Sequence, residues 1–143
     1  MTIVCYRARH MACDSSVLHG GTYIHRIKKI WRVGGGLVGG AGKIADLIKF
    51  VTWLKDGAIE SEFRPGDYHA ITVEPSGKVR AWEGLYSDPL DIEDEYCAVG
   101  AGRDHALGAM FAGADARTAV RAAIRFDNSC AAPVRVYRLG APR

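Results

Sequence analysis

The stretch GGGLVGGAGKIADLIKFVTWL, residues 34–54, changes its hydrophobic period in the middle. Residues 36–42 form a short apolar run rich in glycine, which is typical of a buried strand. The apolar residues that follow recur at steps of three and four, as on one face of a helix: Ile44, Leu47, Ile48, Val51 and Leu54. The stretch therefore predicts a strand followed directly by an amphipathic helix.

The same glycines suggest a phosphate-binding loop, which requires Gly, four residues and then Gly-Lys-Ser/Thr. Counting back from Gly42 and Lys43, the first glycine would fall at Leu37, and Ile44 occupies the hydroxyl position. These two differences remove the close backbone approach to phosphate and the magnesium ligand. The sequence therefore argues against nucleotide binding at this stretch.

The rest of the chain predicts runs of strands and runs of helices rather than strict alternation. Strands are expected at residues 2–6, 10–14, 25–31, 36–42, 69–74, 78–84, 97–102 and 132–139. Helices are expected at 44–54, around 107–111 and at 116–124. Ala8-Arg9 is expected to form a tight turn, residues 15–23 a polar connection, and Asp115 a helix cap. This order indicates an α+β fold, with residues 1–143 in one domain.

Composition narrows the classes of function. The net charge of +3 is mild and its charges are interspersed, so no basic stripe for nucleic acid is expected. No apolar run reaches the length of a membrane span, and the first residues lack a secretory pattern. We therefore expect a cytoplasmic protein whose scattered cysteines, Cys5, Cys13, Cys97 and Cys130, are free thiols.

Several motifs, in this order along the chain, resemble those of the proteasome β-subunit family, most closely its bacterial HslV-type branch. They are TIV at 2–4, IKKIWR at 27–32, GGAGKIADL at 39–47, AVGAGRDHALGA at 98–109 and DNSCAAPVRVY at 127–137. The resemblance covers nearly the whole chain. It implies the fold of an N-terminal-nucleophile (Ntn) hydrolase, a four-layer α-β-β-α sandwich of two mainly antiparallel sheets, and a threonine-type peptidase without a cofactor.

The resemblance allows two alignments of the first residues. Either Thr2 is the catalytic threonine, or Met1 occupies that position and Thr2 matches the family's second residue. We favour Thr2, because Asp14 follows it by twelve positions and the family's spacing is also even. An even difference in length keeps each side chain on its own face of the strand. An aminopeptidase could remove Met1, since the residue after it is small.

The resemblance also implies the other site residues. Asp14 in ACDSS matches the catalytic Asp, and Lys29 in IKKI matches the catalytic Lys. Gly39 in GGAGKIAD matches the glycine whose N–H forms the oxyanion hole. Asp127 and Cys130 in DNSCAAPV match a loop that supports the amine of the nucleophile.

The implied chemistry is the hydrolysis of peptide amides in unfolded proteins. A threonine hydroxyl needs an adjacent base, and the free α-amine of a terminal Thr2 can serve. Lys29 would favour the alkoxide by its charge, and Asp14 would hold Lys29 in place. The Gly39 N–H would donate to the tetrahedral intermediate, an interaction often worth about 3 kcal/mol.

The sequence departs from the family pattern at two points. Ala101 stands between Gly100 and Gly102, where the family usually has a serine hydroxyl. Residues 57–68 are too few for the second long helix that family members carry after the first, which argues against a helix contact between stacked rings. Ala101 and the retained Met1 support an alternative function, that of a non-catalytic relative. In either case the resemblance implies a homo-oligomeric ring, a hexamer or heptamer that can stack on a second ring, with an AAA+ ATPase unfoldase as a partner.

A metal-binding module is a second alternative from a different class. Cys5, His10, Cys13 and His19 lie close together in the sequence, and thiolate and imidazole are zinc ligands. Their spacings match no standard zinc motif, and alternation along strands would separate the side chains.

Overall fold

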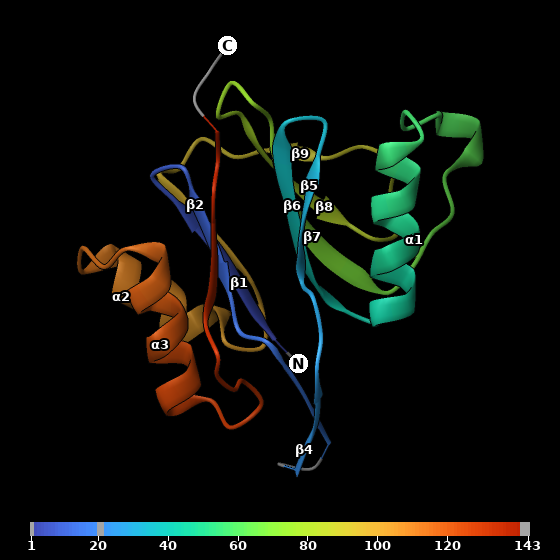
Figure 1. The fold of residues 1–143 in the computed structure, drawn as a ribbon. Coiled ribbons are helices and arrows are strands. Elements are labelled where there is room, and N and C mark those ends of the chain that lie inside the picture. The colour runs from blue at the N-terminus through green and yellow to red at the C-terminus, as the bar shows by residue number, and fades with distance from the viewer. Residues whose placement is uncertain (1, 20–21, 141–143) are drawn as a thin grey trace.

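The computed structural model describes residues 2–19 and 22–140, which form four layers (Figure 1). Helices α2 (Arg103–Phe111) and α3 (Ala116–Phe126) cover one side, and α1 (Ile44–Lys55) covers the other. Two antiparallel sheets lie between these helix layers. The expected α+β fold and its α-β-β-α order are therefore confirmed.

The first sheet packs against α2 and α3. Its strand order is β10 (Tyr96–Gly100), β1 (Ile3–Arg7), β2 (His10–Cys13) and β11 (Arg135–Arg138). Ala8 and Arg9, which join β1 to β2, have φ of 50° and 68°, as a two-residue hairpin turn requires. The turn predicted at these two residues is confirmed.

The second sheet packs against α1. Its strand order is β5 (Ile30–Val33), β6 (Gly36–Gly42), β7 (Tyr68–Val73), β8 (Val79–Glu83) and β9 (Leu90–Asp91). The glycine-rich residues 36–42 form a central strand rather than a phosphate-binding loop, as expected. The expected strands did not include the short edge strand β9.

The segment between the two sheets differs from the prediction. Residues expected to be a polar connection form a two-stranded hairpin, β3 (Ser16–His19) and β4 (Thr22–Arg26). The single strand expected at 25–31 is wrong, because residues 27–29 are irregular and carry the chain from this hairpin into the second sheet. The N–H of Ile27 donates to the Ser15 carbonyl at 2.9 Å, which fixes this crossing.

Three apolar cores hold the layers together. The core between the sheets consists mainly of Val4, Met11, Ile30, Leu37, Ile71 and Val73. The core between the first sheet and its helices includes Ile3, Cys5, Met110, Ala119, Val120 and Ala123. The third, beneath α1, contains Leu47, Phe50, Tyr68, Ala70 and Trp82. The alternation of side chains along β1, with Ile3 and Val4 in different cores, links the first two.

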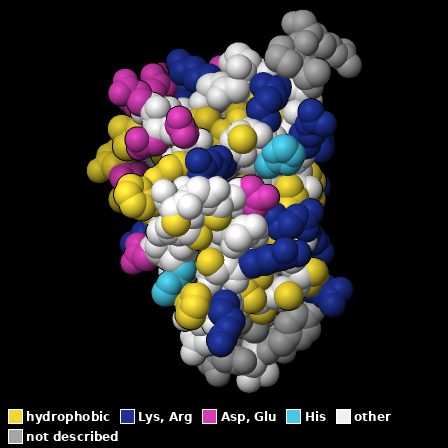
Figure 2. Space-filling model, turned by 90° about the vertical axis from the view of Figure 1, so that its left-hand side faces the viewer, with side chains coloured by type: hydrophobic (Ala, Val, Ile, Leu, Met, Phe, Trp, Pro, Cys, Tyr) yellow, Lys and Arg dark blue, Asp and Glu magenta, His cyan; other side chains and the backbone are white. Residues whose placement is uncertain are grey.

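The helices follow their sequence signals. The Asp115 carboxylate accepts a hydrogen bond from the Thr118 N–H at 2.8 Å, so the predicted cap of α3 is confirmed. Arg117, Arg121 and Arg125 are exposed on the outer face of α3. Figure 2 views this helix layer from outside and shows many basic side chains across it.

Between α1 and β7 the described residues contain one short 3-10 helix, Glu60–Glu62, in place of a second long helix. This agrees with the expectation from the length of the segment. Within the described ranges, no helix is long and apolar enough to cross a membrane.

Phe50 is the centre of the aromatic cluster under α1, with ring centroids 4.8 Å from Tyr68 and 5.0 Å from Trp82. We predict that Phe50→Ala lowers the free energy of unfolding by about 3–5 kcal/mol, as for other buried aromatic residues. Ile48→Ala on the exposed face of the same helix, where half of the side chain is accessible, should change it by less than about 1 kcal/mol. Urea denaturation measures both, and equal effects would contradict this packing.

Candidate active site

A fully buried carboxylate, Asp14, gathers four hydrogen-bond donors directly after β2. Its Oδ1 accepts from Thr2 Oγ1 at 2.5 Å and from Lys29 Nζ at 2.8 Å. The N–H of Ile3 donates to the same oxygen at 3.1 Å, and that of Ala131 donates to Oδ2 at 3.2 Å. The structure therefore brings together three residues predicted for the site, Thr2, Asp14 and Lys29.

Lys29 is 3% exposed, and its ammonium group forms a buried ion pair with Asp14. The Ser16 carbonyl accepts a second hydrogen bond from Lys29 Nζ at 2.9 Å. An ammonium group carries three N–H donors, so these two acceptors leave one proton for a further partner. The irregular residues 27–29 run from the β3–β4 hairpin, beside Ser15, to the start of β5 at Ile30. This crossing directs the Lys29 side chain inward.

Two glycines enclose the backbone of Thr2. The N–H of Gly102 donates to the Thr2 carbonyl at 3.3 Å. Gly100 has a φ of +109°, and a Cβ there would overlap with the Thr2 carbonyl oxygen. Ala101, between them, is exposed and supplies no hydroxyl group. The turn thus positions Thr2, while the serine-like hydroxyl of the family pattern is missing.

A cavity of about 170 Å³ opens beside Thr2 and Lys29. Its remaining walls come from the end of β6, from β3, from the residue after β4, and from the start of α1: Ser16, Val17, Ile27, Gly40, Ala41, Gly42, Ile44 and Leu47. Most of these side chains are apolar. The cavity therefore suits a small apolar group placed next to the threonine.

The structure places Gly39 outside this cavity, which contradicts its predicted role in the oxyanion hole. A Cβ at Gly39 would lie 2.7 Å from Val4 and 2.8 Å from Met11, so this residue faces the core between the sheets. The N–H of Gly40 donates to the Lys29 carbonyl at the β5 side. Since successive N–H groups of a strand alternate in direction, the Gly39 N–H points to β7 and is part of the ladder.

Gly42 has the geometry that the sequence assigned to Gly39. The Lys43 N–H donates to the Asp67 carbonyl at the β7 side, at 2.7 Å. Because successive N–H groups alternate in direction, the Gly42 N–H points to the β5 side of the sheet. Strand β5 begins at Ile30 and does not extend opposite Gly42, so this N–H points into the cavity that Gly42 lines. The signal that could have identified Gly42 is its position as the last residue of the expected strand, directly before the helix.

Asp127 and Cys130 lie in the loop after α3, and neither forms a hydrogen bond with the Thr2 hydroxyl, which donates to Asp14. Asp127 accepts hydrogen bonds from the Ser129 N–H at 2.8 Å and from its hydroxyl at 2.5 Å, and these bonds lower the pKa of Asp127. Cys130 is buried in the core behind β1, and burial raises its pKa to about 11. The loop reaches the site through Ala131, whose N–H contacts Asp14 and which the sequence analysis missed.

The zinc alternative does not fit the structure. Cys5 packs in the core beneath α2 and α3, whereas Cys13 packs in the core between the sheets. His10 is exposed and its Nδ1 lies 2.8 Å from the Ala8 carbonyl oxygen. The side chain of His19 lies outside the described part, and the described residues contain no group of three metal-binding side chains.

No known family model and no curated protein matches the sequence. Among solved structures, the chain is similar to BPH from Thiobacillus denitrificans, solved alone and in complex with epoxomicin. The TM-score is 0.66 with 20% sequence identity, over 97% of this chain and 98% of that chain. It is also similar to eukaryotic HslV from Trypanosoma brucei, with a TM-score of 0.69 and 21% identity, over 95% of this chain and 97% of that chain.

These similarities extend over almost the full length of both chains. They show that this chain has the fold of HslV-type proteins, an Ntn-hydrolase fold. The resemblance found from the sequence motifs is therefore confirmed at the level of the fold.

We predict that Lys29→Met lowers the free energy of unfolding by about 3–5 kcal/mol, because it leaves the Asp14 carboxylate buried without its counter-ion. The double variant Asp14→Asn/Lys29→Met removes both charges and should recover part of this loss. Chemical denaturation of the two variants and the unaltered chain measures the difference. A single variant as stable as the unaltered chain would contradict the buried ion pair.

We predict that Cys130 is unreactive in the folded protein. With a pKa of about 11 its thiolate fraction at pH 8 is roughly a hundredfold below that of an ordinary cysteine. Alkylation by iodoacetamide, followed by peptide mapping, should be slow in buffer and fast in urea. Rapid labelling of Cys130 in the native protein would contradict its structural role and make it a candidate nucleophile.

Proposed function

We propose that this chain is a threonine-type peptidase subunit in which Thr2, after removal of Met1, is the nucleophile. One observation carries the proposal: Thr2 Oγ1, Asp14 and Lys29 form a single buried network at the wall of a cavity. Met1 lies outside the described residues, so its removal belongs to the proposal. The fold of HslV-type proteins supports it at the coarser level.

The nucleophile needs a base to accept its proton. Once Met1 is removed, the α-amine of Thr2 is free and lies on the same residue as the hydroxyl. Lys29 is held by Asp14 and the Ser16 carbonyl, and its third N–H can donate to Thr2 Oγ1 as the alkoxide forms. Asp14 therefore orients both the hydroxyl and the ammonium group.

The Gly42 N–H takes the oxyanion role in this proposal. Thr2 Oγ1 attacks the carbonyl carbon of the scissile amide, and negative charge develops on the carbonyl oxygen. A backbone donor placed at that oxygen contributes on the order of 3 kcal/mol to transition-state stabilisation. The C–N bond then breaks, the amine leaves with the proton taken from Thr2, and water hydrolyses the resulting ester.

The cavity of about 170 Å³ supports a preference in this reaction. Its walls include Val17, Ile27, Ile44 and Leu47, which would bind a small apolar side chain next to the scissile bond. The substrate class is therefore a peptide or an unfolded segment, since an extended chain must lie along the site.

Ala101 favours a second candidate, a non-catalytic protein with the same fold. The proton network lacks the hydroxyl that the family pattern has at this position, and Thr2 Oγ1 is already engaged by Asp14 at 2.5 Å. In this case the buried network would serve only to join the two sheets.

The resemblance also supports assembly, which we include in the proposal. Copies of the chain form a homo-oligomeric ring in the cytoplasm, with an AAA+ ATPase as a partner that delivers unfolded protein. Phe111 on α2 is 83% exposed and Phe126 on α3 is 68% exposed. Large apolar side chains of this kind on one helix layer suit contacts between subunits.

We predict that Thr2→Ala lowers peptide amide hydrolysis by at least about a thousandfold, because it removes the nucleophile. Thr2→Ser should retain measurable activity, and Ala101→Ser should raise activity by restoring a hydroxyl group beside Thr2. Release of a fluorescent amine from peptides with a small apolar residue measures all three. Equal rates for the unaltered chain and Thr2→Ala would support the non-catalytic candidate instead.

A further inference from the structure

A second and larger cavity, of about 500 Å³, is lined by neither Thr2 nor Lys29. Ala41 and Gly42 line both this cavity and the one beside Thr2. A peptide whose carbonyl oxygen is held at the Gly42 N–H would therefore extend into both. The apolar cavity would receive one side of the scissile bond, and the larger cavity the other.

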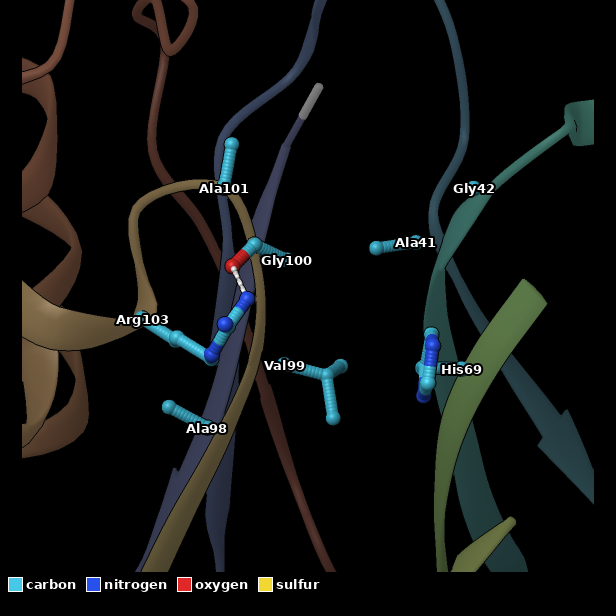
Figure 3. Close-up of a pocket in the computed structure, with 8 residues that line it drawn as sticks. All are labelled: Ala41, Gly42, His69, Ala98, Val99, Gly100, Ala101 and Arg103. Carbon is cyan, nitrogen blue, oxygen red and sulfur yellow. Dashed lines mark hydrogen bonds between the residues drawn. The ribbon is translucent and has the colours of Figure 1, made fainter. Parts of the chain in front are cut away.

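The larger cavity has apolar walls and two basic side chains. One wall comes from β6 and β7, with Ala41, Gly42 and His69, and the other from β10 and the start of α2. Figure 3 shows His69 and Arg103 on these opposite walls, with Val99 between them. None of the residues that line the cavity is acidic. The cavity thus offers the guanidinium group of Arg103 and the imidazole group of His69 to a negatively charged ligand.

Arg103 is available to such a group. Its Nη1 donates to the Gly100 carbonyl at 3.2 Å, which fixes the guanidinium beside the Thr2 turn and leaves its other N–H groups. Its acidic neighbour, Asp104, is 3.9 Å away and 88% exposed, so this pair contributes little and competes weakly. A guanidinium in this position matches the two oxygens of a carboxylate.

We infer that the larger cavity binds a carboxylate of the substrate and that Arg103 selects it. The carboxylate lies on the side of the scissile bond away from the apolar cavity, which rests on the proposed function. His69 supplies a second N–H from the opposite wall. An acidic side chain and the terminal carboxylate of a short peptide present the same chemical group, and the experiment distinguishes these two sources.

The test uses the Thr2→Ala chain, so that bound peptides remain intact. Fluorescent peptides built around one small apolar residue carry Glu or Gln at single flanking positions, and end in a carboxylate or a carboxamide. We expect one carboxylate position to strengthen binding about fivefold over its neutral twin, measured by fluorescence anisotropy. A gain from Glu alone indicates an acidic side chain, and a gain from the free terminus indicates the end of a peptide.

Three variants assign the preference to Arg103. Arg103→Gln should abolish it, and Arg103→Glu should reverse it in favour of Lys at the same peptide position. Arg117→Gln, on the exposed outer face of α3, is the matched control and should leave it unchanged. A merely structural role of Arg103 would not reverse the preference. The ratio of kcat/KM between Glu and Gln peptides on the chain with Thr2 intact gives an independent reading.

Two outcomes would overturn the inference: no carboxylate peptide binds more tightly than its neutral twin, or Arg103→Gln keeps the same preference. Failure of the proposed function has a different signature. In that case the chain with Thr2 intact does not hydrolyse peptides, while Arg103-dependent binding persists. Hydrolysis without any effect of Arg103 would leave the peptidase and remove the carboxylate site.

Discussion

The buried carboxylate of Asp14 is the interaction on which the rest of the structure depends. A charge at this depth is tolerated only because donors from separate segments converge on it: Thr2 and Ile3 from the start of the chain, Lys29 from the crossing between sheets, and Ala131 from the last loop. These segments are the start of the first sheet, the crossing into the second sheet and the loop that follows α3. The same contacts that close the fold therefore position the threonine and the ammonium group for chemistry.

Glycine explains how neighbouring segments within each sheet approach closely enough to form the site. At Gly100 and Gly42 the backbone adopts positive φ, and a side chain at either would overlap with neighbouring backbone atoms, those of Thr2 and Asp67 respectively. This approach leaves one N–H, that of Gly42, at the boundary of two cavities of different character. In the proposed function, an extended substrate would place one side of its scissile bond in the apolar cavity and the other side in the basic cavity.

The sequence predicted those parts of the fold that have a local cause. Apolar periodicity located α1 and α3, Asp115 capped a helix, and the strands around Ala8-Arg9 needed only a two-residue turn. The β3–β4 hairpin escaped prediction because its apolar residues, Val17, Leu18, Tyr23 and Ile24, occur in adjacent pairs and do not alternate with polar residues. The sequence motif assigned the oxyanion role to Gly39, because the direction of each N–H depends on where the neighbouring strand β5 begins, and the sequence does not give this. The motif resemblance identified Thr2, Asp14 and Lys29 because these residues follow the same order along the chain as the family's catalytic residues. Local hydrophobic patterns do not distinguish them from ordinary strand and loop residues.

The central claim is that Thr2 becomes the first residue, so that its amine and hydroxyl act together. The most direct test is the intact mass of the protein purified from the cells that produce it. The account predicts a mass lower than that of the printed sequence by one methionine residue, with Thr2 at the amino terminus. A mass that retains Met1 in every molecule would contradict it, since the nucleophile would then lack its base.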